Sequence, residues 1–182
     1  VAMAAPSYAN TLTFQGVRFD TVSSGNMLTL IITNALSGGS GNWANVNFLK
    51  AFEIKDIGNV TGVTLGAGFD SSWGSTVDLG LASAAGCTTG GTPGACFYRS
   101  PALALSDSMT FTMTFSGTNL DFSAPSLKIQ FLTNLYDTKA TGDLLSQTLP
   151  IPEPEIYAML AVGLGVLGWR VHKRKPKEAT AG

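Results

Sequence analysis

The sequence predicts an all-β fold, an antiparallel β-sandwich of Greek-key or jelly-roll type, followed by a single C-terminal transmembrane helix. Apolar residues alternate with Thr and Ser along several short segments, and this period of two is typical of half-buried strands. The chain has 21 glycines among 182 residues, and only 13% of its residues are charged. This composition favours short strands and tight turns over helices. A charge-free run followed by basic residues near the C-terminus predicts the membrane helix.

The first predicted strands lie in the N-terminal half of the chain. Apolar residues recur at every second position in three segments: at Leu12 and Phe14, at Val17 and Phe19, and at Leu28, Leu30 and Ile32. Residues 42–58 carry apolar side chains at mixed spacing, which fits either a strand with a bulge or a strand with a short helix, and we favour the strand. The segments 60–68 and 75–81 are short and contain β-branched residues, which favour strands.

The clearest strands are predicted further along the chain. Residues 108–117 place four apolar side chains against an uninterrupted face of Thr and Ser: Met109, Phe111, Met113 and Phe115. Residues 126–132 repeat this strict alternation. No stretch before Pro150 shows sustained helical periodicity, so the predicted body is entirely β.

The two cysteines, Cys87 and Cys96, lie in the sequence CTTGGTPGAC. Nothing nearby supplies a third or fourth metal ligand, so a zinc site is not expected. Two cysteines nine positions apart in a Gly-, Thr- and Pro-rich loop instead predict a small disulfide-closed ring. A structural disulfide requires an oxidising compartment.

The expected organisation has five parts. Residues 1–9 are rich in small side chains and fit the end of a signal peptide or a disordered leader. The β-sandwich is expected over 10–148 and a Pro-rich linker over 149–155, where prolines stiffen the chain. A transmembrane helix over 156–171 and a basic cytoplasmic tail over 172–182 complete the chain.

The expected helix is short for a membrane span. Residues 156–169 carry no charge and would extend about 21 Å as a helix, against the ~30 Å hydrocarbon core, so a buried core helix is the alternative. Basic residues directly after an apolar helix mark its cytoplasmic end. They are Arg170, Lys173, Arg174, Lys175 and Lys177.

Small residues line one face of this expected helix. They are Ala158, Ala161, Gly165 and Gly168. Such a face permits close packing against another membrane helix. The alternative is that small residues are simply common in membrane helices.

The tail resembles the PEP-CTERM sorting signal of Gram-negative bacteria. That signal combines a Pro-Glu-Pro motif, a short transmembrane helix and a basic end, which here are Pro152-Glu153-Pro154, residues 156–169 and residues 170–177. The resemblance implies export by a signal peptide and recognition by an exosortase, a membrane cysteine transpeptidase that would cut near the motif. It implies an inner-membrane protein with a periplasmic domain, passed to the cell surface or the extracellular matrix. Such proteins typically accompany exopolysaccharide production.

The body offers little catalytic chemistry. The single histidine, His172, lies in the basic end, so the body lacks a His for a Ser-His-Asp or Cys-His arrangement. Most carboxylates lie beside Gly, Ser, Thr or Asn, where turn capping is their ordinary role, although sequence alone does not exclude a glycosidase pair. We therefore expect no enzyme and no cofactor. A structural calcium ion held by scattered loop Asp residues remains an alternative.

Two tryptophans provide a candidate ligand site. Trp43 and Trp73 lie in GNWAN and SSWGS, which look like exposed loops where a ring could stack on a sugar. The alternative is that both rings cap the ends of the sandwich, since tryptophan usually buries most of its area.

The expected function is that of a non-enzymatic surface or matrix protein sorted through its C-terminal signal. The alternatives are an exopolysaccharide-binding module and a membrane-anchored accessory subunit that docks on a membrane-protein partner through its helix. The mildly acidic body shows no electrostatic footprint for nucleic acid. Homo-assembly remains open, because exposed Thr- and Ser-rich edge strands would permit strand addition.

Overall fold

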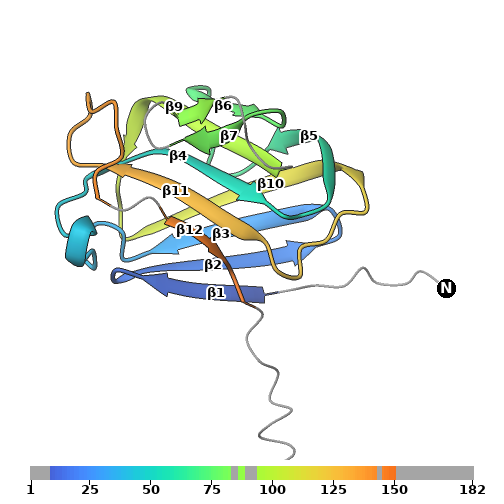
Figure 1. The fold of residues 1–182 in the computed structure, drawn as a ribbon, viewed down its shortest axis with the longest axis horizontal. Helices are drawn as coiled ribbons and strands as arrows, with labels where there is room; N and C mark the ends of the chain where they lie inside the picture. The colour runs from blue at the N-terminus through green and yellow to red at the C-terminus, as the bar shows by residue number, and fades with distance from the viewer. Residues whose placement is uncertain (1–8, 83–85, 89–93, 143–144, 151–182) are drawn as a thin grey trace, which may run out of the picture. The chain divides into compact units, whose positions relative to one another are not determined.

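The computed structural model describes residues 9–82, 86–88, 94–142 and 145–150, which form an all-β fold of antiparallel sheets (Figure 1). The chain divides into two units, Val1–Ile151 and Pro152–Gly182, and every described residue belongs to the first. Residues 1–8 of the leader expected over 1–9 lie outside the described residues, and Ala9 belongs to the first strand. The helix expected over 156–171 and the basic tail over 172–182 also lie outside them. Within the described residues, none of the helical structure is long and apolar enough to span a membrane.

Two five-stranded sheets make up the body. In spatial order, the first sheet consists of β1 (Ala9–Phe14), β2 (Val17–Ser24), β3 (Met27–Thr33), β10 (Ser108–Thr118) and β5 (Asn59–Leu65). The second consists of β12 (Leu145–Thr148), β11 (Ser126–Leu132), β4 (Phe48–Lys55), β9 (Gly94–Ala104) and β6 (Trp73–Thr76). A separate hairpin joins β7 (Gly80–Ala82) to β8 (Gly86–Thr88), and a 3₁₀ turn, η1, covers Gly41–Trp43.

The first two hairpins of the chain have two-residue loops. Phe14 pairs with Val17 around Gln15 and Gly16, whose φ angles are 45° and 81°. Two successive positive φ angles are those of a type I′ turn, whose twist matches that of antiparallel strands. Gly16 is required there for a second reason, because a Cβ at this position would overlap the carbonyl oxygen of Gly38.

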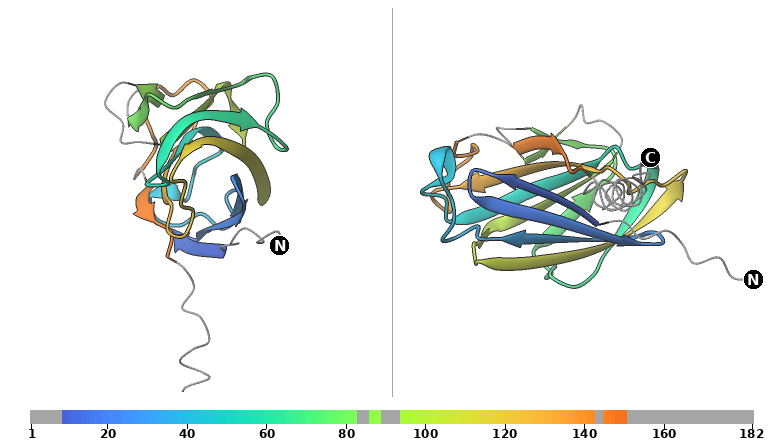
Figure 2. Two further views of the ribbon diagram at one scale, coloured as in Figure 1. Left: turned by 90° about the vertical axis from the view of Figure 1, so that its right-hand side faces the viewer. Right: turned by 90° about the horizontal axis from the view of Figure 1, so that it is seen from below.

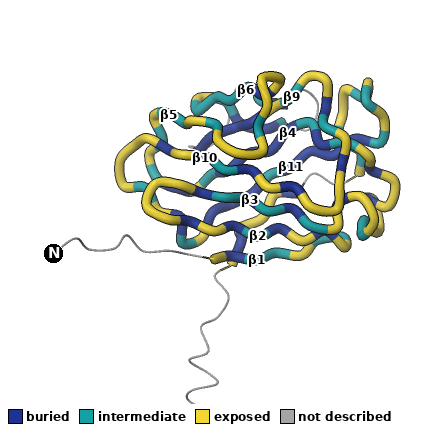
Figure 3. Tube along the Cα trace, turned by 180° about the vertical axis from the view of Figure 1, so that it is seen from behind, coloured by how far each residue is buried: buried dark blue, intermediate teal, exposed yellow. Residues whose placement is uncertain are grey.

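The core lies between the two sheets, whose strands curve around a common interior (Figure 2). The ring of Phe52 in β4 lies 5.3 Å, centroid to centroid, from that of Phe111 in β10, so side chains of the two sheets touch directly. Buried positions alternate with exposed or half-buried ones along β2 and most of β10, as the predicted period of two requires (Figure 3). These contacts define a β-sandwich-like body, as predicted.

Strand β4 explains the mixed spacing of residues 42–58. Leu49 pairs with Phe131 and Ala51 pairs with Gln130, so Lys50 is an extra residue and forms a bulge. The favoured prediction of a strand is confirmed for Phe48–Lys55, which carries the bulge, while the segment begins within the 3₁₀ turn η1. Beyond the bulge β4 is buried on both faces, from Ala51 to Ile54, and two buried faces remove the alternation that identifies most strands.

Candidate functional site: the disulfide-tethered hairpin

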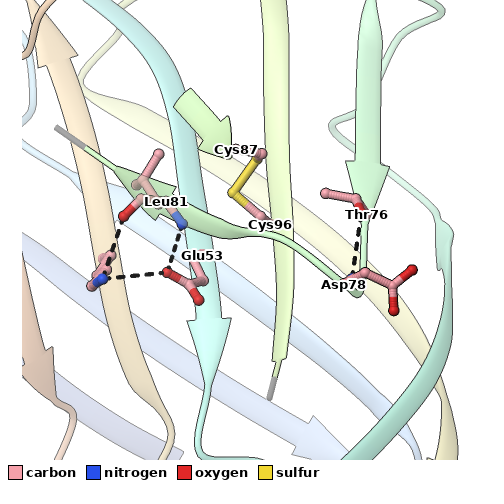
Figure 4. Close-up of a disulfide and its surroundings, with 7 residues drawn as sticks. Glu53, Thr76, Asp78, Leu81, Cys87 and Cys96 are labelled. Atoms are coloured by element: carbon pink, nitrogen blue, oxygen red, sulfur yellow. Dashed lines mark hydrogen bonds and ion pairs between the residues drawn. A yellow bond between two sulfur atoms is a disulfide. The ribbon is translucent and has the colours of Figure 1, made fainter. Parts of the chain in front are cut away.

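The hairpin β7–β8 is attached to the outer face of the second sheet. Cys87 in β8 forms a disulfide with Cys96 in β9, with an S–S distance of 2.07 Å (Figure 4). This confirms the disulfide predicted from the sequence. Leu81 in β7 packs with Ala51 and Cys96 in a small buried cluster that is separate from the main core. The hairpin thus covers apolar surface that the sheet would otherwise expose.

A carboxylate and an ammonium group hold the backbone of β7. Glu53 is 1% exposed, and its Oε2 accepts a hydrogen bond of 3.0 Å from the Leu81 N–H. Lys128 Nζ lies 3.8 Å from the same Oε2 and donates to the Leu81 carbonyl oxygen at 3.3 Å. A buried carboxylate is tolerated only when it is paired and hydrogen-bonded. Both polar groups of the Leu81 backbone are therefore held from the sheet below.

Glu53 is the residue of this site that sequence reasoning did not single out. Its neighbours in the sequence AFEIK are Phe52 and Ile54, so its position between apolar residues was the available signal. Most other carboxylates in the body lie beside turn residues. The carboxyl group of Glu53 accepts the Leu81 N–H and lies 3.8 Å from Lys128 Nζ, and this arrangement anchors β7 to the sheet.

Gln130 is a second unusual polar residue on this face of the sheet. It pairs with Ala51 across β11 and β4 and is fully buried. Neither Oε1 nor Nε2 of its amide has a hydrogen-bond partner in the described part of the chain. Burying an amide without partners costs free energy that an apolar side chain of similar shape does not.

Replacing Gln130 with methionine is expected to stabilise the protein. The Gln130→Met variant keeps the length of the side chain and removes two buried polar atoms, so its free energy of unfolding should rise by about 1–2 kcal/mol. Urea denaturation followed by circular dichroism measures this change. Gln147→Met is the matched control, because Gln147 is exposed on the neighbouring strand β12 and its replacement should change stability by less than about 0.5 kcal/mol. A Gln130→Met variant that is less stable than the wild type would show that the Gln130 amide has hydrogen-bond partners.

The sugar-stacking role suggested for Trp43 and Trp73 is wrong. Trp43 is 1% exposed and Trp73 is 7% exposed, and both lie in the main apolar core. Trp43 ends the 3₁₀ turn η1, and its N–H donates to Gln15 Oε1 at 3.0 Å. Trp73 begins β6 and packs against Phe52, Phe69 and Phe111. Neither ring offers a free face to a ligand. The alternative, that both tryptophan rings are buried in the sandwich, agrees with these exposures.

Several of the aspartates cap turns, as predicted. Asp70 Oδ1 accepts the Ser72 N–H at 2.8 Å, and Asp121 Oδ1 accepts the Ser123 N–H at the same distance. A side-chain hydrogen bond from Arg99 is the main reason that the pKa of Asp70 is lowered. The backbone hydrogen bond from Ser123 chiefly lowers the pKa of Asp121. Such bonds stabilise the ionised carboxylate.

The described ranges contain no cluster of three or more His, Cys, Asp or Glu side chains able to hold a metal ion. The calcium alternative, which relies on scattered Asp residues and backbone carbonyls, stays a prediction. The sorting motif Pro152-Glu153-Pro154 lies outside the described residues. So do the basic cluster, Arg170, Lys173, Arg174, Lys175 and Lys177, and the small-residue face, Ala158, Ala161, Gly165 and Gly168.

No protein-family model, curated protein or solved structure matches this chain.

Proposed function

We propose that this chain is an exported, non-enzymatic protein of the cell surface or extracellular matrix, delivered there through its C-terminal sorting signal. The observation that carries the proposal is the disulfide between Cys87 and Cys96. Structural disulfides persist in secreted and periplasmic proteins and are rare in the cytosol. An exported body agrees with the resemblance of residues 152–177 to a PEP-CTERM signal.

The unusual polar residues of the body support a structural role. Glu53 and Lys128 are engaged with each other and with the backbone of Leu81. Asp70 is ion-paired with Arg99 at 2.9 Å. These contacts engage both carboxylates in holding elements of the fold together, which supports a structural role.

The finer architecture belongs to the same proposal. The chain passes between the two main sheets from β3 to β4, β4 to β5, β5 to β6, β9 to β10 and β10 to β11, which is the kind of order found in Greek-key and jelly-roll sandwiches. A single transmembrane helix over 156–171 would hold this body at the periplasmic side of the inner membrane until an exosortase cuts the chain.

Intact-mass measurement of the protein recovered from the surface fraction of its native host tests the proposal. The mature protein should lack the residues that follow the motif. A variant with Pro152→Ala, Glu153→Ala and Pro154→Ala should keep them and stay in the membrane fraction. Pro150→Ala, in the same stiff segment but outside the motif, is the control and should be processed normally.

A mature surface protein that keeps its complete tail would contradict sorting by this signal. A complete tail that co-purifies with a stoichiometric membrane partner in mild detergent would favour the accessory-subunit alternative instead.

A further inference from the structure

The two main sheets have four edge strands, and three of them carry features that discourage pairing with another chain. Edge strands expose unpaired backbone groups, and short length or a bulge protects them. β6 and β12 have only four residues each. In β5, Gly62 pairs with Ser116 and Val60 pairs with Gly117, so Thr61 forms a bulge. The remaining edge is β1.

β1 has none of these protections. Its six residues, ANTLTF, include no charge and no proline. It pairs with β2 without a register shift from Ala9↔Val22 to Phe14↔Val17. The inward-facing side chain of Asn10 is held in place, because its Nδ2 donates to the Phe122 carbonyl oxygen at 3.2 Å. β1 is therefore a regular and pre-formed strand with one open side.

The type I′ turn determines which backbone groups face the open side. In this turn the Phe14 carbonyl accepts the Val17 N–H, so Phe14 and Val17 form a hydrogen-bonded pair. Hydrogen-bonded and non-hydrogen-bonded pairs alternate along antiparallel strands. The N–H and C=O groups of Ala9, Thr11 and Thr13 therefore point away from β2. In the described part of the chain, no backbone hydrogen bond outside the sheet pairings involves these three residues.

We propose that β1 pairs antiparallel with β1 of a second copy of this chain, about a two-fold axis at Thr11. Thr11 then faces Thr11 of the second copy, and Ala9 faces Thr13 in both directions. This register pairs all three outward-facing residues, and each pair exchanges two hydrogen bonds. The first sheets of the two molecules become one continuous sheet.

The sequence of β1 suits self-pairing in particular. A charged residue on an edge would face the like charge of its own copy in a two-fold arrangement, and β1 has none. The Thr11 hydroxyl donates to Asp20 Oδ1 of its own chain at 2.6 Å, so the backbone groups, and not a bond between the two Thr11 side chains, join the copies at the axis. Because the strand is short, the interface is small, and the dimer is expected to be weak and to depend on concentration. This inference does not depend on the sorting proposal.

Sedimentation velocity of the full chain in mild detergent tests the inference. Thr11→Pro removes an N–H that β2 does not use, and Thr11→Lys places like charges opposite each other at the axis. Each change acts twice in the dimer, so each should weaken dimerisation by about tenfold or more. Thr110→Lys is the matched control, because Thr110 is exposed on the same sheet but in the central strand β10. This variant should dimerise as the wild type does. Cooperative melting of each variant checks that it folds.

Cysteine cross-linking tests the register independently. The chain has only two cysteines, which are bonded to each other, so an introduced cysteine is the single free thiol. Cα atoms of a hydrogen-bonded pair lie about 5.5 Å apart, within the range of a disulfide. Thr11→Cys should therefore give a disulfide-linked dimer on mild oxidation, and Thr13→Cys, which faces Ala9, should give far less.

Three outcomes would overturn the inference. The first is a wild-type protein that stays monomeric at all accessible concentrations. The second is dimerisation that Thr11→Pro and Thr11→Lys leave unchanged, which would place the contact elsewhere, for example in the C-terminal tail. The third is equal cross-linking of Thr11→Cys and Thr13→Cys.

Discussion

Replacing Trp43 with alanine is expected to lower the free energy of unfolding by about 3–5 kcal/mol. The Trp43 ring lies edge-on to Phe14 and Phe19 of the first sheet and to Phe131 of the second, with centroid distances of 5.1, 6.1 and 4.9 Å. It therefore fills the space between the two layers. Alanine would leave a cavity that the strands on either side cannot close, because their backbones are fixed by pairing in both sheets.

Urea denaturation of the purified protein, followed by far-ultraviolet circular dichroism, measures this loss. The control is Tyr136→Ala, which removes an aromatic ring that is 88% exposed and should change stability by less than about 0.5 kcal/mol. Equal stability of the two variants would mean that Trp43 is not packed between the sheets.

Removal of the disulfide by the double change Cys87→Ala and Cys96→Ala is expected to cost about 2–3 kcal/mol. The disulfide closes a short loop, since its cysteines are nine positions apart, and short loops lie toward the lower end of the usual range. The hairpin β7–β8 would then depend on the contacts of Leu81 with Glu53 and Lys128. We expect the loss of stability to be concentrated in the hairpin β7–β8, because the main core does not include it.

Two measurements check this second prediction. Thermal melting should show a lower transition temperature for the double variant than for the wild type. A reductant should lower the transition temperature of the wild type but not that of the variant. Hydrogen exchange should show reduced protection of the Leu81 N–H, whereas the N–H groups of β3 should exchange as before. A variant with unchanged melting and unchanged exchange at Leu81 would show that the hairpin is held without its disulfide.

The strands that the sequence predicts best are those with one buried face. In β10, Met109, Phe111, Met113 and Phe115 are buried while the Thr and Ser residues between them are exposed or half-buried. This alternation is a local property, since each side chain takes one face of the sheet in turn. Spacing and loop composition were also sufficient to predict the disulfide.

The residues that escaped prediction are those whose surroundings come from distant parts of the chain. Glu53 and Gln130 lie on the face of the second sheet where the hairpin β7–β8 attaches, and both are buried. Trp43 and Trp73 occur between Gly, Ser and Asn residues that are typical of exposed loops, yet both rings enter the core. Burial depends on which elements pack together, and local composition does not contain that information.

The sequence by itself determined the strand-rich class of this protein and its disulfide, and it predicts a sorting signal in the C-terminal tail, because periodicity, cysteine spacing and charge order are local patterns. Only the tertiary structure decided that the tryptophans are core residues, that Glu53 and Lys128 hold the covering hairpin, and that β1 is the unprotected edge. These properties arise when strands far apart in the chain pair and the two sheets close on each other. Pairing of this kind depends on contacts over long sequence separations, which no single stretch of residues specifies.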